Sequence, residues 1–177
     1  MMIGGWESFH GEGGNWDGTP VGDMLPVEIR STDDRTNFCH GALLAPPDDR
    51  NALWGLPWYS PPAIGGLNDV SFKEGVDCEC LLEAFAMTPY RVECGDDQYR
   101  FEWEDSLGSY PVLVTCEHAK GRVAAFTSDV APHWVGGFVD WGPERVKAQA
   151  PGAAAIEVGS HYAQFWKQLL SWVGRLE

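Results

Sequence analysis

The chain opens with MMIGGWESFHG, residues 1–11, and this stretch decides which fold the sequence predicts. Met1, Met2 and Ile3 form an apolar run that stops at two glycines, which is typical of a short strand covered on both faces, as in a parallel sheet. A parallel strand reaches its neighbour only through a crossover connection. We therefore expect either that a strand from late in the chain pairs with residues 1–3, or that a segment preceding them is missing.

Composition and charge exclude several classes of protein. With 177 residues, 44% of them hydrophobic, and nine tryptophans, the chain is expected to fold as one domain over residues 1–177. The formal net charge of −14 disfavours nucleic acid and anionic membranes as partners. The sequence contains no apolar stretch of transmembrane length and does not begin like a signal peptide, which predicts a cytoplasmic protein.

The cysteines are Cys39, Cys78, Cys80, Cys94 and Cys116. Their odd number and irregular spacing favour reduced thiols over a disulfide framework. Cys78-x-Cys80 and Cys116-x-His118 would each place two zinc ligands on one face of a strand. Because the usual C-x₂-C spacing is absent, core or edge thiols are the better interpretation, and we expect no metal and no cofactor.

The first part of the chain is predicted to be mostly irregular. Residues 4–19 form a glycine-rich loop, and Thr19-Pro20 then supplies an N-cap and a first-turn proline for a helix over 20–24. A brief strand is expected over residues 26–29. Residues 30–66 are interpreted as irregular surface with one helical turn near Arg50–Leu53, and such a long irregular stretch often has a binding or lid role.

The second half has clearer periodicity. Strands are predicted over Cys80–Phe85 and Tyr99–Trp103, and Pro111–Glu117 and Arg122–Phe126 are expected to form a β-hairpin through residues 118–121. A loop over residues 129–140 follows. A C-terminal helix is indicated by apolar residues at helical spacing on one face, namely Tyr162, Phe165, Trp166, Leu169, Leu170 and Val173. These elements predict an α/β fold with at least part of its sheet mixed.

Two segments together resemble the signature blocks of the class I glutamine amidotransferase-like proteins. They are MMIGGWESFHGEGGNWDGTPVGDMLPV, residues 1–27, and PVLVTCEHAKGRVAAFTSDVAPHW, residues 111–134. The resemblance implies a cytoplasmic protein with a flavodoxin-like three-layer α/β sandwich, a mostly parallel sheet plus a hairpin, and a distant relation to trehalose-utilisation proteins. Members of this family usually carry several dozen residues before this point. The resemblance therefore implies an N-terminally incomplete domain, and we expect the 177-residue chain to be a homo-oligomer or marginally stable.

The resemblance also draws attention to a missing nucleophile. Class I amidotransferases place a nucleophilic Cys on the turn after such a strand, where a His that is oriented by a Glu activates it. Here Gly4, Gly5 and Trp6 follow the strand. A displaced nucleophile, Cys39 or Cys116, is the less favoured alternative. We therefore predict a protein that does not hydrolyse glutamine.

Polar residues from two loops are expected to meet at the carboxyl ends of the strands, where open α/β sheets bind ligands. His10 and Glu12 come from the glycine-rich loop, and Asp129 and His133 come from the loop after Phe126. These four are the catalytic candidates, and His133 stands where the family resemblance places the catalytic His. The candidate ligand-binding residues are Gly4, Gly5, Trp6, Ser8 and Trp134.

A purely structural role is an alternative for several of these residues. Asp129 could cap a turn, and His133 could be buried and form a hydrogen bond with the backbone. Gly11, Gly13 and Gly14 could approach a phosphate, but without the order of a P-loop or dinucleotide motif, tight turning is the favoured explanation. The sequence thus predicts binding or processing of an unknown small molecule, hydrolase- or transferase-like if enzymatic. The alternatives are a non-catalytic binding or assembly module and a carbohydrate-metabolism protein.

Overall fold

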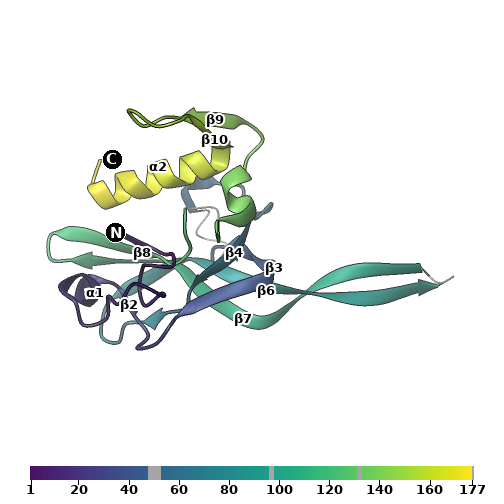
Figure 1. Cartoon of the computed structure of the whole chain (residues 1–177), viewed down its shortest axis with the longest axis horizontal. Helices are drawn as coiled ribbons and strands as arrows, with labels where there is room; N and C mark the ends of the chain where they lie inside the picture. Colours follow the sequence, from purple (N-terminus) through teal and green to yellow (C-terminus); the bar gives the residue numbers. More distant parts are fainter. Residues whose placement is uncertain (48–52, 96–97, 131–132, 177) are drawn as a thin grey trace.

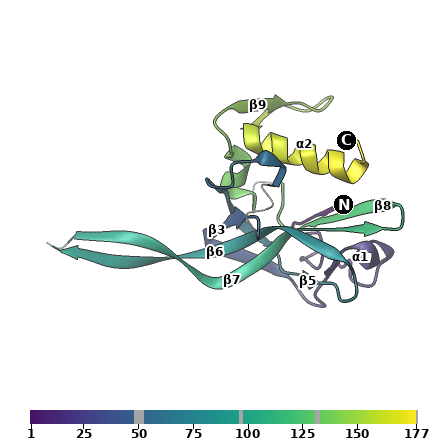
Figure 2. The ribbon, with the colours of Figure 1, turned by 180° about the vertical axis from the view of Figure 1, so that it is seen from behind.

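The computed structural model describes residues 1–47, 53–95, 98–130 and 133–176, and its centre is one six-stranded mixed sheet (Figures 1 and 2). The strand order is β1-β8-β7-β6-β3-β4. The bounds are β1 Met2–Ile3, β3 Arg35–Ala45, β4 Ala63–Asn68, β6 Cys78–Gly95, β7 Gln98–His118 and β8 Gly121–Phe126. Two small antiparallel pairs lie outside this sheet, β2 Val27–Glu28 with β5 Ser71–Phe72, and β9 Arg145–Ala148 with β10 Ile156–Gly159.

The opening strand pairs with a strand from late in the chain, as the first of the two alternatives predicts. Residues Met2 and Ile3 lie opposite Ala125 and Phe126 of β8, in parallel orientation. The other pairs of the described sheet are antiparallel. The α/β class is therefore confirmed, whereas the predicted mostly parallel sheet is wrong. The physical reason is that short connections join β6 to β7 and β7 to β8, and a short connection permits only antiparallel pairing.

Residues 30–66, predicted to be irregular, contain β3 and most of β4, so that prediction is wrong. Strand β3 hides its periodicity because its register shifts between Asn37 and Ala42, around Gly41 with φ of 80°. The first half of β3 is also polar and mostly not buried. The helical turn predicted near Arg50–Leu53 lies largely outside the described residues, and a 3₁₀ turn, η1, spans Leu53–Gly55.

Several local predictions are confirmed. Helix α1 spans Pro20–Met24, and the Thr19 hydroxyl accepts a hydrogen bond of 3.1 Å from the backbone N–H of Gly22. Strands β7 and β8 form the expected hairpin, with His118 opposite Gly121. Helix α2 spans Ser160–Gly174, and a second 3₁₀ turn, η2, spans Gly136–Asp140. Among the described residues, no helix is long and apolar enough to cross a membrane.

Both faces of the sheet are covered (Figure 1). Helix α2 packs on one face, where Phe165 and Leu169 are fully buried against a cluster that includes Phe126. On the other face, the loop after β1 and the α1–β2 segment bury a smaller cluster that includes Phe9. Ile3 packs against the first cluster and Met2 against the second, as expected for a strand covered on both sides. Leu170 is 52% exposed, so its predicted place on the buried face of the helix is wrong.

A two-stranded arm projects from this body (Figures 1 and 2). The pairing of β6 with β3 ends at Ala86, which lies opposite Ala42. From Met87, opposite Asp105, to Gly95, opposite Gln98, the described residues of β6 pair only with β7. We call residues 87–105 the arm.

Candidate functional site

The glycine-rich loop is fixed at the carboxyl ends of β1 and β8 by one buried amide side chain. The Oδ1 atom of Asn68 accepts a hydrogen bond of 2.8 Å from Gly5 N–H, and its Nδ2 atom donates to Gly5 O at 3.2 Å and Ser8 O at 3.3 Å. The Gly4 N–H donates to Phe126 O at 2.7 Å. The last residue of β4 thereby ties the loop to the ends of the two parallel strands.

A buried carboxylate completes this anchor. Asp34 is 3% exposed, and its Oδ1 and Oδ2 atoms accept hydrogen bonds from Asn68 Nδ2 at 2.7 Å and His10 N–H at 2.9 Å. Burial raises the pKa of Asp34, and these hydrogen bonds oppose the rise. Among the described residues, the buried Nδ1 atom of His10 has no hydrogen-bond partner. A buried nitrogen without a partner in this loop is a place where a water or a ligand is expected.

Three side chains from three segments stack beside this anchor, and we call Trp6, Arg35 and His133 the platform. Trp6 is 43% exposed as a whole residue, and its ring lies 5.5 Å, centroid to centroid, from the His133 ring. The Cζ atom of Arg35 lies 4.8 Å from the centre of the Trp6 ring. This is a cation–π arrangement within the usual range.

Two carboxylates hold Arg35 in place on the platform. Asp33 Oδ1 and Oδ2 accept hydrogen bonds from Arg35 Nε at 2.8 Å and NH2 at 2.6 Å, and Glu12 Oε2 accepts one from NH1 at 3.1 Å. These hydrogen bonds lower the pKa of Asp33 to about 2 and raise that of Arg35. The predicted candidates Glu12 and His133 are thus brought to one place, and Arg35 and Trp6 lie between them.

Asp129 and Trp134 are both in structural contacts. Asp129 is 4% exposed, and its two oxygens accept a hydrogen bond from the Trp134 N–H at 3.2 and 3.3 Å. Asp129 therefore caps a turn, which is the structural alternative to a catalytic role. Burial raises the pKa of Asp129. The Trp134 ring is 2% exposed and donates from Nε1 to Asn37 Oδ1 at 2.8 Å. His133, in contrast, is exposed and is not the buried histidine of the non-catalytic alternative.

Five residues that hold the site together are not among the predicted candidates; four of them lie in residues 30–66, the stretch predicted to be irregular, and Asn68 lies just after it. They are Asp33, Asp34, Arg35, Asn37 and Asn68. Their sequence signal was weak, because two adjacent carboxylates next to an arginine, followed by a polar run, are also typical of an exposed loop. Without a strand assignment, nothing in the sequence placed them beside the glycine-rich loop.

Two of the cysteines, Cys80 and Cys116, are poor candidates for the missing nucleophile. Burial raises the pKa of Cys116 and raises that of Cys80 to about 12, which disfavours the reactive thiolate. Cys39 is an exposed residue of β3. In the part of the chain that the structure describes, no group of three or more His, Cys, Asp or Glu side chains is arranged to hold a metal ion.

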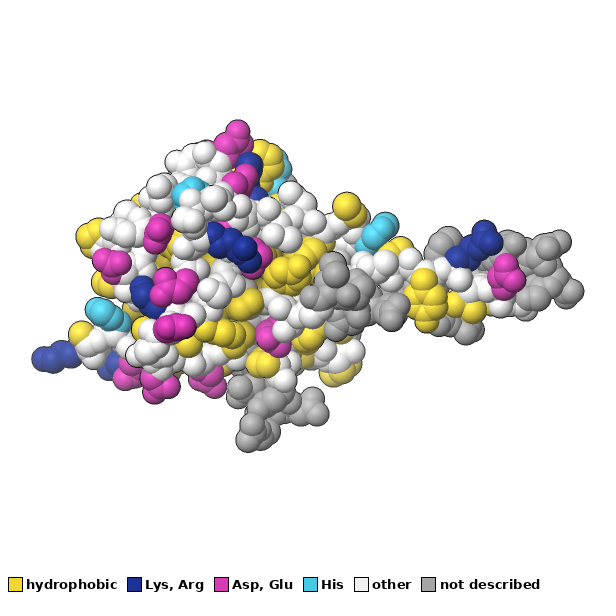
Figure 3. All heavy atoms as spheres, turned by 90° about the horizontal axis from the view of Figure 1, so that it is seen from below, with side chains coloured by type: hydrophobic (Ala, Val, Ile, Leu, Met, Phe, Trp, Pro, Cys, Tyr) yellow, Lys and Arg dark blue, Asp and Glu magenta, His cyan; other side chains and the backbone are white. Residues whose placement is uncertain are grey.

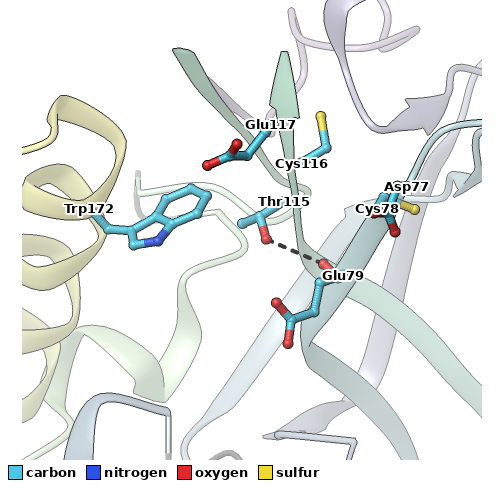
Figure 4. A pocket seen from close by; sticks show the side chains of 7 residues that line it. All are labelled: Asp77, Cys78, Glu79, Thr115, Cys116, Glu117 and Trp172. Atoms are coloured by element: carbon cyan, nitrogen blue, oxygen red, sulfur yellow. Dashed lines mark hydrogen bonds between the residues drawn. The ribbon is translucent and has the colours of Figure 1, made fainter. Parts of the chain in front are cut away.

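A cleft of about 610 Å³ lies elsewhere, near the turn between β7 and β8 (Figure 4). Helix α2 contributes Trp172 to one wall, and β6 and β7 contribute the other. The lining residues are Asp77, Cys78, Glu79, Thr115, Cys116, Glu117 and Trp172. On the side of the body away from α2, acidic side chains are spread over the surface, in keeping with the net charge (Figure 3). None of the residues that line the cleft belongs to the platform, so the two sites are separate.

Comparison with known proteins supports the resemblance. Residues 101–175 match the model of a family described as "Putative glutamine amidotransferase", so the resemblance predicted from the sequence is confirmed. The solved structure "Cytoplasmic Protein STM1381 from Salmonella typhimurium LT2" is 27% identical to this chain with a TM-score of 0.65, and the match covers 97% of this chain and 54% of that one. A second solved structure, "Cytoplasmic Protein STM3548 from Salmonella typhimurium", is 22% identical with a TM-score of 0.61, and the match covers 97% of this chain and 53% of that one.

The chain spans about half the length of these two solved structures. At 22% identity, the second structure shows a shared fold and nothing about function. No curated protein matches the sequence.

Proposed function

We propose that this chain, which resembles the glutamine amidotransferase-like family, is a cytoplasmic protein that binds a small polar molecule at the platform and does not hydrolyse glutamine. We also propose that its sheet is part of a flavodoxin-like sandwich. The similarity to two proteins described as cytoplasmic supports the compartment. The Gly4-Gly5-Trp6 turn supports the absence of glutaminase chemistry.

The observation that carries the proposal is the exposed Trp6 ring between Arg35 and His133 at the ends of the two parallel strands. Ligands of open α/β sheets bind outside the carboxyl ends of the strands. Trp6, a residue that is 43% exposed, offers a flat apolar surface, and the histidine and arginine beside it offer polar contacts. The unsatisfied Nδ1 of His10 adds a further hydrogen-bonding position in the neighbouring loop.

If the protein is an enzyme, its chemistry is hydrolase- or transferase-like and His133 is the group that acts as acid or base. Asp129 already accepts hydrogen bonds from the backbone, and Glu12 already binds Arg35. The exposed imidazole of His133 is therefore the catalytic candidate with the most direct access to a ligand on Trp6.

A thermal-shift screen of small polar metabolites tests the proposal. We expect compounds that raise the Tm of the wild-type protein and lose this effect in Trp6→Ala and His133→Ala. Trp16→Ala is the matched control, because Trp16 is also an exposed tryptophan of the glycine-rich loop, at 37%, and does not belong to the platform. Compounds that raise the Tm of both platform variants by the same amount as that of the wild type would show that the ligand binds elsewhere.

The arm favours a second candidate function, that of a self-assembling module. An isolated two-stranded hairpin is marginally stable in water, and the arm extends beyond the last pair with β3 without a third strand among the described residues. We propose that a second copy of the chain supplies the missing packing, which would make the protein a homo-oligomer.

Shortening the arm tests this second candidate. Met87 and Asp105 lie directly opposite each other, so residues 88–104 can be replaced by Asn-Gly, the preferred two-residue hairpin turn. We expect the wild-type chain to be oligomeric by light scattering and the shortened chain to be monomeric with an unchanged circular-dichroism spectrum of the body. A monomeric wild-type protein would exclude the assembly role of the arm.

A further inference from the structure

Three of the five cysteines share one face of the central sheet. Cys78 and Cys80 are two residues apart on β6 and both pack against the smaller hydrophobic cluster. Cys116 lies on the adjacent strand β7, directly opposite Cys78. The sequence shows the spacing of these residues, and only the register of the two strands shows that Cys78 and Cys116 lie opposite each other.

The register places Cys78 and Cys116 within reach of a direct bond. Directly opposite residues of an antiparallel pair have Cα atoms about 4.5–5.5 Å apart. Disulfides need a Cα separation of about 4.4–6.8 Å. Cys80 lies opposite Val114 instead, so it has no thiol facing it across this pair of strands. Both cysteines of the pair are free thiols in the structure.

The surroundings allow a reagent to reach this pair. Cys78 is half-buried and Cys116 is 7% exposed, and both line the cleft of about 610 Å³. In Figure 4 the two residues lie on neighbouring strands, on the side of the cleft remote from Trp172. Burial is the main cause that raises the pKa of Cys116, the nearby Cys78 adds to it, and the ammonium group of Lys73 opposes it. Cys78 is therefore the more accessible thiol, and Cys116 is its neighbour inside the sheet.

We infer that Cys78 and Cys116 form a reversible modification site, which a small disulfide such as oxidised glutathione converts into a cross-strand disulfide. The Cys78 thiolate attacks one sulfur of the glutathione disulfide, its S–S bond breaks, and one glutathione leaves as a thiolate. The Cys116 thiolate then attacks the Cys78 sulfur of the mixed disulfide and releases the second glutathione. Two protein thiols lose two electrons and two protons, and one glutathione disulfide gains them as two glutathione thiols.

The bond would join β6 and β7 at the wall of the cleft and on the body side of the arm. It would covalently close the segment between residues 78 and 116, which contains the whole arm. This inference does not depend on the proposed ligand site, because no residue of the platform takes part in it.

Peptide mapping after oxidation tests the inference. The full chain is incubated with oxidised glutathione, free thiols are blocked with iodoacetamide, and the protein is cleaved after glutamate under non-reducing conditions. Cleavage after Glu79 separates Cys78 from Cys80, and cleavage after Glu117 releases the peptide of Cys116. We expect a cross-linked species containing Cys78 and Cys116 that disappears on reduction with dithiothreitol.

Variants give matched controls. Cys78→Ser should abolish the cross-link, and Cys80→Ser, which changes the other partly buried thiol of β6, should leave its yield within about twofold of the wild type. Because Cys78 is only half-buried, its substitution should preserve the fold, which the circular-dichroism spectrum checks. A wild-type protein that carries only glutathione adducts, a bond to Cys80 or Cys94 instead, or no modification would overturn the inference.

Discussion

At the scale of single residues, Gly4 and Gly5 explain why the turn after β1 cannot simply regain a nucleophile. A Cβ atom on Gly4 would lie 2.0 Å from Thr127 O and 2.8 Å from Asn68 Oδ1, which no side chain tolerates. Gly5 has more space, but its φ of 146° lies in a region that residues with a side chain rarely adopt. The backbone of this turn is therefore built for glycine.

We expect no release of ammonia from glutamine by the purified chain, since the family's first step needs a thiolate at this turn. A coupled glutamate dehydrogenase assay measures it. The prediction would be refuted by ammonia release that persists through purification and is lost in Cys39→Ser or Cys116→Ser, because that would identify a displaced nucleophile.

Asn68 is the residue whose loss should damage the candidate site most. Its amide makes hydrogen bonds to Gly5, Ser8 and Asp34, and it is fully buried. Asn68→Ala leaves buried partners unsatisfied, which costs about 1–3 kcal/mol for each unsatisfied group. We expect a loss of about 2–4 kcal/mol in the free energy of unfolding, measured by urea titration. Asn15→Ala, at an exposed position of the same loop, is the control and should change it by less than about 0.5 kcal/mol.

Asp34 predicts a dependence of stability on pH. Burial raises the pKa of Asp34 in the folded state, so the protonated form is favoured there. The stability that this group contributes is present below its ordinary pKa of about 4 and is lost as the pH rises through the raised value. Asp34→Asn cannot titrate. The free energy of unfolding of the variant minus that of the wild type should therefore increase from pH 4 to pH 7, and a difference that stays constant or falls would contradict this sign.

At the scale of elements, helix α2 holds the larger core together through one stripe of side chains. Phe165 is fully buried and its ring lies 5.8 Å from that of Phe126 and 5.2 Å from that of Phe138. Phe165→Ala should lower the free energy of unfolding by about 3–5 kcal/mol. Leu170→Ala, on the exposed side of the same helix, should change it by less than about 0.5 kcal/mol. Similar losses for both variants in urea titrations would show that the helix packs in another orientation.

The elements that could be predicted are those with local signals. Thr19-Pro20 predicts the start of α1, and the short turn at residues 118–121 predicts the β7–β8 hairpin. The helical spacing of apolar residues predicts α2. Strand β3 could not be predicted because the register shift near Gly41 interrupts its alternation. The extension of β6 and β7 into the arm likewise depends on mutual pairing, which no local pattern reveals.

At the scale of the whole molecule, the candidate site could be predicted only in part. The two loops after β1 and β8 could be brought together from the sequence, since both strands end at the same edge of a parallel pair. The partners that fix them could not, because Asn68 lies 63 residues from Gly5, and Asp34 lies 24 residues from His10. These contacts form although β1 and β4 stand at opposite edges of the strand order, because the end of β4 returns to the end of β8, where Asn68 N–H donates to Thr127 O at 2.9 Å.

The most direct measurement of the central claim is a two-dimensional ¹H–¹⁵N NMR titration of the wild-type chain with the best compound of the thermal-shift screen. The platform account predicts that backbone amide shifts concentrate in residues 4–12 and 133–135. It also predicts little change around Glu79 and Thr115, which line the separate cleft. Shifts confined to residues 77–79 and 115–117, with the platform amides unmoved, would contradict the proposal that the ligand binds at the ends of the two parallel strands.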